Sequence, residues 1–309
     1  MARAHASIVI DAPVEAVWAV VRDFGALASW VSAVSECRVE DGRDGDSVGC
    51  IRSLKLGDGA PVRERLLELD DCRYRFSYNF ETPAFPVENY LATFELIPVV
   101  DGDRTFAQWS ATFDEAPEDR GKYVAIVSEQ VFATGLGSLA AMAVGRPVPD
   151  GVTRWLGHRP AKVFASSVIV AGIEAVWERM RDFISMDQWH PALRDMHMLA
   201  GARSDKVSGV REFALGDGEL HEQLTLLSDV ERAFSYRILK SPMPWLDYHA
   251  GAKLYPVTAT GHTFAVWTAD WIASPNDDVR LIPLVCDDVF QLAFTTLGAQ
   301  LQAARATPV

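Results

Sequence analysis

The chain has 309 residues, of which 49% are hydrophobic and 23% are charged, and its formal net charge at pH 7 is −13. This length provides apolar material for two hydrophobic cores, and the acidic balance argues against a nucleic-acid-binding protein, because phosphate contacts need clustered Lys and Arg. Since no run of 18 apolar residues occurs and the first residues lack the apolar core of a signal peptide, we expect a cytoplasmic protein that does not span a membrane.

The first predicted elements are a short strand at Ser7–Ile10 and a helix that starts near Pro13, a residue type that suits the first helical turn. Apolar residues recur at i, i+3, i+4 and i+7 from Val14 to Val21, which is the period of an amphipathic helix. Alternating segments separated by Gly, Asp and Pro turns follow, and they predict a meander of antiparallel strands. A longer helix closes the series, with an apolar stripe between Leu136 and Ala143.

The same series of elements then repeats at an offset of 158 to 159 residues. The strand recurs at Ser167–Val170, the first helix recurs from Ile173, and the closing helix recurs with an apolar stripe from Phe294 to Leu301. A period this long indicates two whole domains rather than a solenoid. We therefore expect a first domain at residues 1–144, a linker at residues 145–160, where Pro and Gly cluster, and a second domain at residues 161–309.

The most detailed repeat is a hairpin that contains an arginine, a Gly-Asp-Gly turn and a glutamate in the same order. It reads GCIRSLKLGDGAPVRERLLELDD from position 49 and GVREFALGDGELHEQLTLLSD from position 209. Strand alternation puts Arg52 and Glu64, and likewise Arg211 and Glu222, in phase with the apolar residues of their strands. Four tyrosines and two tryptophans in later strands share this inward phase: Tyr78, Tyr90, Tyr236, Tyr248, Trp109 and Trp267. Each copy is thus predicted to place an Arg, a Glu and two Tyr inside a mostly apolar cavity.

These inward charges have three possible roles. Buried unpaired charges are costly, so each Arg and Glu is expected to pair with the other or with a ligand. The pair could be a structural brace for a curved sheet, part of a binding site without chemistry, or part of a catalytic site. In a catalytic site the Glu acts as general acid or base, and the Arg and Tyr side chains stabilise an oxyanion.

Neither a metal site nor a cofactor site is predicted. The sequence has no HExxH motif and no paired His or Cys spacing, and His221, beside Glu222, is expected to face outward. The G-x-G-x-x-A stretch at Gly135–Ala140 follows a helical pattern rather than a strand, so a dinucleotide site is rejected. The cysteines are expected to be reduced thiols; they are Cys37, Cys50, Cys72 and Cys286.

Taken together, these motifs resemble the START-like, Bet v 1-like (SRPBCC) superfamily, in particular its polyketide cyclase/dehydrase-like branch. The resemblance rests on the V-W pair of the first helix, the loop residues Trp30 and Trp189, the arginine before L-G-D-G, the E-x-L and F-S-Y strands, and the late tryptophan of each copy. It implies an α+β fold that is a tandem duplication of a helix-grip fold. In that fold a curved antiparallel sheet wraps around a long C-terminal helix and encloses an internal cavity.

The resemblance also implies a function, although one fold can host many activities. It favours a cofactor-independent enzyme, a cyclase, dehydratase or isomerase of the lyase or isomerase class, that acts on a small apolar oxygenated metabolite. The alternative is a hydrophobic small-molecule binding or transport protein without catalysis. The expected ligand is small and hydrophobic, or aromatic and polyketide-like.

A more distant likeness to lachrymatory factor synthase implies roles for single residues. By this likeness the catalytic arginine and glutamate fall on the two inward Arg–Glu pairs, and the inward tyrosines support them. The second copy has a W-H-P loop at residues 189–191, where the first copy has Trp30-Val31-Ser32. The second copy is therefore expected to be the active one. The residues expected to contact a ligand are His190, Trp189, Trp30, Trp109 and Trp267.

Overall fold

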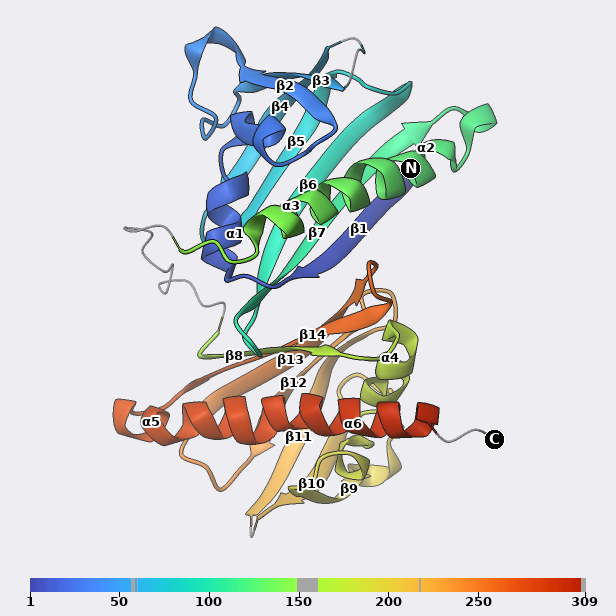
Figure 1. Ribbon diagram of the computed structural model, residues 1–309. Helices are drawn as coiled ribbons and strands as arrows, with labels where there is room; N and C mark the ends of the chain where they lie inside the picture. Colours follow the sequence, from blue (N-terminus) through green and yellow to red (C-terminus); the bar gives the residue numbers. More distant parts are fainter. Residues whose placement is uncertain (57–58, 60, 149–160, 217, 307–309) are drawn as a thin grey trace. The chain divides into compact units, whose positions relative to one another are not determined.

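Each half of the chain folds around a seven-stranded antiparallel sheet (Figure 1). The computed structural model describes residues 1–56, 59, 61–148, 161–216 and 218–306. Most of the predicted linker, and part of each predicted Gly-Asp-Gly turn, lie outside the described residues. The chain divides into two compact units, one around each sheet. The tandem helix-grip fold predicted from the sequence is confirmed.

The first sheet has the strand order β1-β7-β6-β5-β4-β3-β2, a meander in which β1 returns to pair with β7. Its elements are β1 (Ala2–Ile10), α1 (Val14–Val21), η1 (Phe24–Ser29), β2 (Val34–Val39), η2 (Glu40–Gly42), β3 (Ile51–Leu56), β4 (Val62–Asp70), β5 (Arg75–Thr82), β6 (Val87–Val99), β7 (Arg104–Glu115), η3 (Pro117–Asp119), α2 (Lys122–Ala125), η4 (Ile126–Ala133) and α3 (Thr134–Ala143).

The second sheet repeats this topology with the order β8-β14-β13-β12-β11-β10-β9. Its elements are β8 (Val163–Ile169), α4 (Ile173–Arg181), η6 (Met186–Gln188), β9 (Leu193–Met198), η7 (Leu199–Gly201), β10 (Val210–Leu215), β11 (Gly218–Ser228), β12 (Ala233–Lys240), β13 (Leu246–Val257), β14 (His262–Ile272), α5 (Pro275–Pro283), η8 (Leu284–Gln291) and α6 (Leu292–Ala306).

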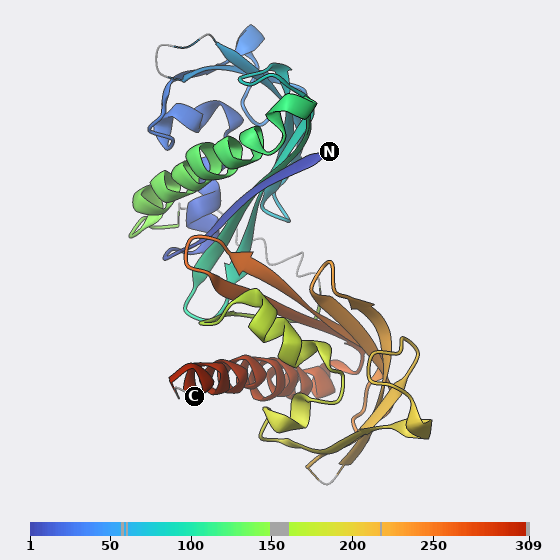
Figure 2. The same ribbon diagram turned by 90° about the vertical axis from the view of Figure 1, so that its right-hand side faces the viewer.

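One long helix lies across a face of each sheet (Figure 2). In the first domain α2, η4 and α3 run on from one another, and the central η4 segment is π-helical. The predicted apolar stripe is buried against the sheet, with Leu136 and Leu139 almost fully covered. By length and composition alone, Lys122–Ala143 and Pro275–Arg305 are apolar enough to cross a membrane. Each of these helices packs an apolar face on its sheet, as the core helix of a folded domain does.

A short hydrogen-bonded clasp ties the first helix of each domain to the turn after its fourth strand. In the first domain Asp71 accepts hydrogen bonds from the indole N–H of Trp18 (2.8 Å) and from Nε of Arg22 (2.7 Å). Asp229 accepts the equivalent bonds at 2.8 and 2.7 Å in the second domain; its donors are Trp177 and Arg181. The V-W pair that marked the repeat therefore has a structural role in each copy.

Candidate functional site

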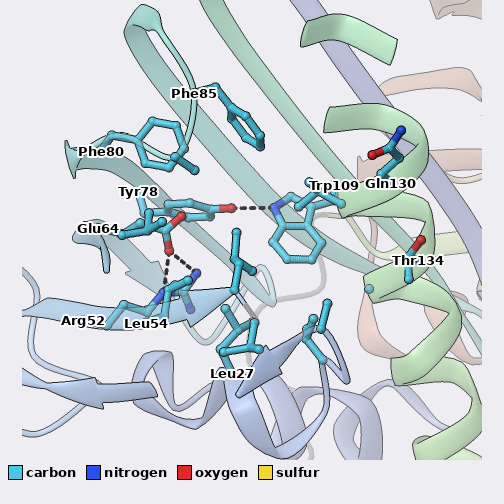
Figure 3. A pocket seen from close by; sticks show the side chains of 18 of the residues that line it. Leu27, Arg52, Leu54, Glu64, Tyr78, Phe80, Phe85, Trp109, Gln130 and Thr134 are labelled. Carbon is cyan, nitrogen blue, oxygen red and sulfur yellow. Dashed lines mark hydrogen bonds and ion pairs between the residues drawn. The ribbon is translucent and has the colours of Figure 1, made fainter. Parts of the chain in front are cut away.

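The first domain contains a cavity of about 280 Å³ between its sheet and its long helix (Figure 3). Five neighbouring strands, β3 to β7, each contribute one predicted site residue to its wall; these are Arg52, Glu64, Tyr78, Tyr90 and Trp109. Most of the remaining wall is apolar, and the exposed side chains of Ala33, Gln130 and Thr134 lie at the rim. The cavity is thus apolar with a small polar group at one side.

Arg52 and Glu64 form a buried ion pair at the centre of this polar group. They lie directly opposite each other on β3 and β4, and their side chains expose only 2% and 8% of their surface. Nε and Nη2 of Arg52 both lie 2.6 Å from Oε2 of Glu64. Nη1 donates to the carbonyl oxygen of Phe24 (3.0 Å), and the Phe24 ring stacks 3.8 Å from the guanidinium carbon. The pair therefore links the β3–β4 hairpin to η1.

The second carboxylate oxygen of Glu64 is available to a ligand. Both contacts with Arg52 use Oε2, and among the described residues Oε1 has no hydrogen-bond donor (Figure 3). A register shift in β4 between Arg63 and Glu64 marks a bulge, a feature that commonly re-aims a side chain. Burial raises the pKa of the Glu64 carboxyl, and the adjacent guanidinium opposes that rise.

The Tyr78 hydroxyl lies in the same polar group. It accepts the indole N–H of Trp109 (3.0 Å), and the ring of Tyr90 lies 6.3 Å from the ring of Tyr78. Burial raises the pKa of both phenols, so both tyrosines are neutral hydrogen-bond donors at physiological pH. The cavity thus offers a carboxylate acceptor and a phenol donor on neighbouring strands.

Gly135 on α3 leaves room for the Trp109 ring at the place where its indole N–H donates to Tyr78. A Cβ atom at Gly135 would lie 3.0 Å from Cζ3 of Trp109, which is closer than ordinary contact. The second domain has Ala293 at the corresponding place, and there the indole N–H of Trp267 is buried without a partner in hydrogen-bonding geometry among the described residues. The glycine that the sequence analysis discarded as a dinucleotide motif is therefore a packing residue beside the cavity.

The second domain repeats the ion pair but surrounds it with different side chains. Arg211 and Glu222 are opposed on β10 and β11 and are as deeply buried as the first pair. Arg211 also donates to the carbonyl oxygen of Phe183, whose ring lies 3.9 Å from the guanidinium carbon. Phe213, which replaces Leu54 of the cavity wall, lies 5.4 Å from the same carbon and takes up interior space. Tyr236 and Tyr248 are buried, with their ring centroids 6.4 Å apart.

The histidine of the W-H-P loop is buried, and both of its ring nitrogens are engaged by the backbone. His190 is 1% exposed, its Nε2 donates to the carbonyl oxygen of Val289 (3.1 Å), and its Nδ1 accepts the backbone N–H of Ala192 (3.2 Å). Burial lowers the pKa of this imidazole, which is therefore neutral and engaged on both nitrogens. In the first domain the corresponding residue is Val31, which lines the cavity.

Two further predicted ligand contacts are core residues. Trp30 is 4% exposed and packs against Phe94 and Trp109, with ring centroids 6.1 and 5.8 Å apart, behind the residues that line the cavity. Trp189 is also 4% exposed, and its indole N–H donates to Ser185 Oγ. Gln130, at the rim of the cavity, was not predicted from the sequence. It belongs to the π-helical segment η4, and π-helical segments often occur at functional sites.

A family model described as polyketide cyclase / dehydrase and lipid transport matches residues 1–144 and 160–288, which is most of both domains. The chain belongs to this family. Membership of the polyketide cyclase / dehydrase and lipid transport family agrees with the two-copy resemblance found in the sequence, and it supports a ligand-binding or cyclase role.

The individual relatives cover from 30% to 100% of this chain. The abscisic acid receptor PYL7 of Arabidopsis thaliana is 32% identical over 98 residues, which are 30% of this chain and 44% of the receptor, so the match spans less than half of that relative. An NMR structure from Thermobifida fusca is 32% identical, with a TM-score of 0.43, and covers 46% of this chain and 93% of its own. The di-domain ARO/CYC BexL from the BE-7585A biosynthetic pathway is 14% identical, with a TM-score of 0.37, and covers 100% of both chains.

Proposed function

We propose that the first domain binds a small apolar oxygenated metabolite in its cavity and converts it without a cofactor, with Glu64 as the acid–base group. The observation that carries the proposal is Oε1 of Glu64, which has no donor in the described part of the chain and lies on a cavity wall that also holds the Tyr78 hydroxyl. A carboxylate and a phenol on neighbouring strands can take a proton from a substrate and stabilise the charge that develops on its carbonyl oxygen.

The reaction class follows from these groups. Glu64 removes a proton from a carbon next to a carbonyl or from a hydroxyl group, and Tyr78 donates a hydrogen bond to the oxygen that becomes negative. Return of the proton to another atom gives an isomerisation, and its delivery to a leaving hydroxyl gives a dehydration. Attack of the new carbanion on a second carbonyl carbon of the same molecule gives a cyclisation, in which the C=O π bond breaks and the resulting alkoxide takes the proton back from Glu64. Arg52 is a positioning residue in this scheme, because its guanidinium is bound to Glu64 and to the carbonyl oxygen of Phe24.

The size of the cavity narrows the substrate class. Its volume of about 280 Å³ is at the small end of the range for ligand pockets. This favours a compact aromatic or alicyclic molecule over a long unfolded polyketide chain. The apolar wall supplies affinity, and the two polar groups supply orientation.

The second candidate is a binding or transport protein for the same kind of molecule. It is favoured by the family description, which includes lipid transport, and by the relative that is named a receptor. In that case Oε1 of Glu64 accepts a hydrogen bond from a ligand hydroxyl, the Tyr78 hydroxyl donates one to a ligand carbonyl, and the ligand is not converted.

The test uses the duplicated domain as its control. Native mass spectrometry of the purified full chain, and of the chain mixed with a panel of small hydroxy-ketones and phenols, identifies compounds that bind; those compounds are then assayed for conversion. Tyr78→Phe removes one hydroxyl and Glu64→Gln removes the charge, and Tyr236→Phe and Glu222→Gln are the matched changes in the second domain.

We expect Glu64→Gln to lower turnover by about 100-fold or more, the usual contribution of a general acid or base, while the compound still binds. The two changes in the second domain leave turnover unchanged. Unchanged turnover in folded Glu64→Gln and Tyr78→Phe proteins would refute the assignment of the site. Binding without conversion of any bound compound, together with weaker binding by Tyr78→Phe, would establish the carrier function instead.

A further inference from the structure

A row of histidine and glutamate side chains crosses the outer face of the second sheet. His197 on β9 is paired with Glu212 on β10, and Glu212 is paired with His221 on β11. Glu219 precedes His221 by two residues and therefore lies on the same face of β11. Among the residues that the structure describes, Glu212, Glu219 and His221 are the one group of three or more His, Cys, Asp or Glu side chains close enough to share a metal ion.

His221 is already held between the two carboxylates. Its Nε2 lies 2.7 Å from Oε2 of Glu212 and 2.8 Å from Oε1 of Glu219, and the side chains are partly exposed, with 21% for His221 and 28% for Glu212. Two ligand atoms on one tetrahedral Zn²⁺ lie about 3.3 Å apart, since each bond is about 2.0–2.1 Å long. To admit an ion, Nε2 of His221 gives up the proton that it donates to these carboxylates and moves about half an ångström away from each of the two oxygens.

The second histidine has the correct tautomer for a ligand. Nδ1 of His197 lies 2.9 Å from the carbonyl oxygen of Asp195, which can only accept, so Nδ1 carries the proton. Nε2 of this ring lies 3.7 Å from Oε1 of Glu212. In the neutral ring, a nitrogen lone pair thus faces a carboxylate oxygen, an arrangement that a cation between them stabilises. A histidine whose other N–H donates to a backbone carbonyl is the usual arrangement in metal sites.

The first domain shows that the fold does not require this row. The positions in the same register there are Arg38, Ser53 and Arg63, which contain no metal ligand. Arg63 instead forms an ion pair with Glu40 (2.7 Å). The two histidines and two glutamates are therefore specific to the second domain, where His197, Glu212 and Glu219 border a surface hollow of about 310 Å³.

We propose that Glu212, Glu219 and His221 bind a divalent transition-metal ion such as Zn²⁺ on the outer face of the second domain, with His197 turning in beside Glu212 as a fourth ligand. Imidazole and carboxylate ligands suit Zn²⁺. Sequence spacing did not predict this site, because its residues meet through the pairing of three strands. Lys240, the next residue across this row, forms an ion pair with Glu219 and competes with the metal for that carboxylate.

The test is a titration of the full, tag-free chain with Zn²⁺ at pH 7.5 by isothermal calorimetry, with Co²⁺ absorption as a spectroscopic readout. We expect one Zn²⁺ per chain. His221→Ala and Glu212→Gln should each weaken binding by at least about tenfold. Lys240→Ala should strengthen binding, because it removes the competing cation. The control is His249→Ala, an exposed histidine whose Nδ1 also bonds the carbonyl oxygen two residues earlier.

Two results would overturn the proposal. The first is no saturable Zn²⁺ binding by either the wild-type chain or the Lys240→Ala variant, which would leave the row as a network of ion pairs. The second is equal Zn²⁺ affinity in the wild-type, His221→Ala and Glu212→Gln chains. Thermal unfolding of each variant without metal checks that the variant is folded. We expect folded variants, because the side chains of His221 and Glu212 are partly exposed.

Discussion

Replacing both members of the Arg52–Glu64 pair by apolar side chains should restore most of the stability that a single replacement removes. The perturbations are Glu64→Leu, Arg52→Met and the double variant. Two unit charges about 4 Å apart attract by about 4 kcal/mol at an effective dielectric constant of 20. Either single change leaves the other charge buried and unpaired, so each should destabilise the first domain by about 3–5 kcal/mol.

The double variant loses this attraction but also avoids the burial of two charges. Apolar replacement of a buried ion pair is often neutral or stabilising by about 1–4 kcal/mol. Against that gain, the carbonyl oxygen of Phe24 loses its donor from Arg52, which costs about 1–3 kcal/mol. The gain from removing two buried charges and the cost of the unpaired Phe24 carbonyl oxygen are similar. The free energy of unfolding of the double variant should therefore lie within about 2 kcal/mol of the wild-type value.

Native-state hydrogen exchange measures this comparison in the full chain, because peptides from β3 and β4 report the opening free energy of the first domain alone. The cycle of single and double variants gives the coupling between the two residues. A double variant that is as unstable as the single variants would refute the reasoning, since the pair would then be a net stabiliser of the fold. A stable double variant that no longer binds the ligand would show that the pair is needed for the site.

Three further predictions concern neighbouring features. Gly135→Ala should lower the melting temperature, because overpacking against Trp109 costs about 1–3 kcal/mol and exceeds the helix-propensity gain of about 1 kcal/mol; an unchanged or higher melting temperature would contradict this. Arg181 lowers the pKa of the Asp229 carboxyl from 3.8 to about 2, so this pair stabilises the fold above about pH 4 and its contribution is lost as the pH falls towards 2; Asp229→Asn should flatten the acid-unfolding curve in that range. His190→Ala should destabilise the second domain by about 1 kcal/mol or more, since it removes the hydrogen bond that this buried side chain makes to the carbonyl oxygen of Val289, without changing ligand binding by the first domain; weaker ligand binding would return His190 to the site.

Much of the fold could be predicted because its signals are local. The period-2 alternation of β3 and β4 was sufficient to place Arg52 and Glu64 inside, and the structure buries both. The repeat of this pattern 158 to 159 residues later was sufficient to predict two domains of one topology. These inferences need only the side-chain period of a strand and the order of the elements.

The cavity could not be assigned to a domain in this way, because its presence depends on side-chain volumes from distant elements. Gly135 on the long helix decides where Trp109 lies, and Trp109 then bonds Tyr78 on another strand. Similarly, the W-H-P motif directed attention to His190, whose two nitrogens are engaged by the backbone. A motif shows that a histidine is present, but only the packing shows whether it is available to a ligand.

The duplication separates the structural role of the ion pair from its chemical role. Both domains contain the pair, and in both the arginine also bonds the carbonyl oxygen of a phenylalanine, which ties the hairpin to the preceding loop. That common role needs no ligand and accounts for the pair in the second domain. The surroundings differ: in the first domain the pair lines a cavity that also holds the Trp109–Tyr78 hydrogen bond, and in the second domain Phe213 lies beside the guanidinium. A chemical role for Glu64 therefore depends on the space beside it, and the comparison of Glu64→Gln with Glu222→Gln measures that dependence directly.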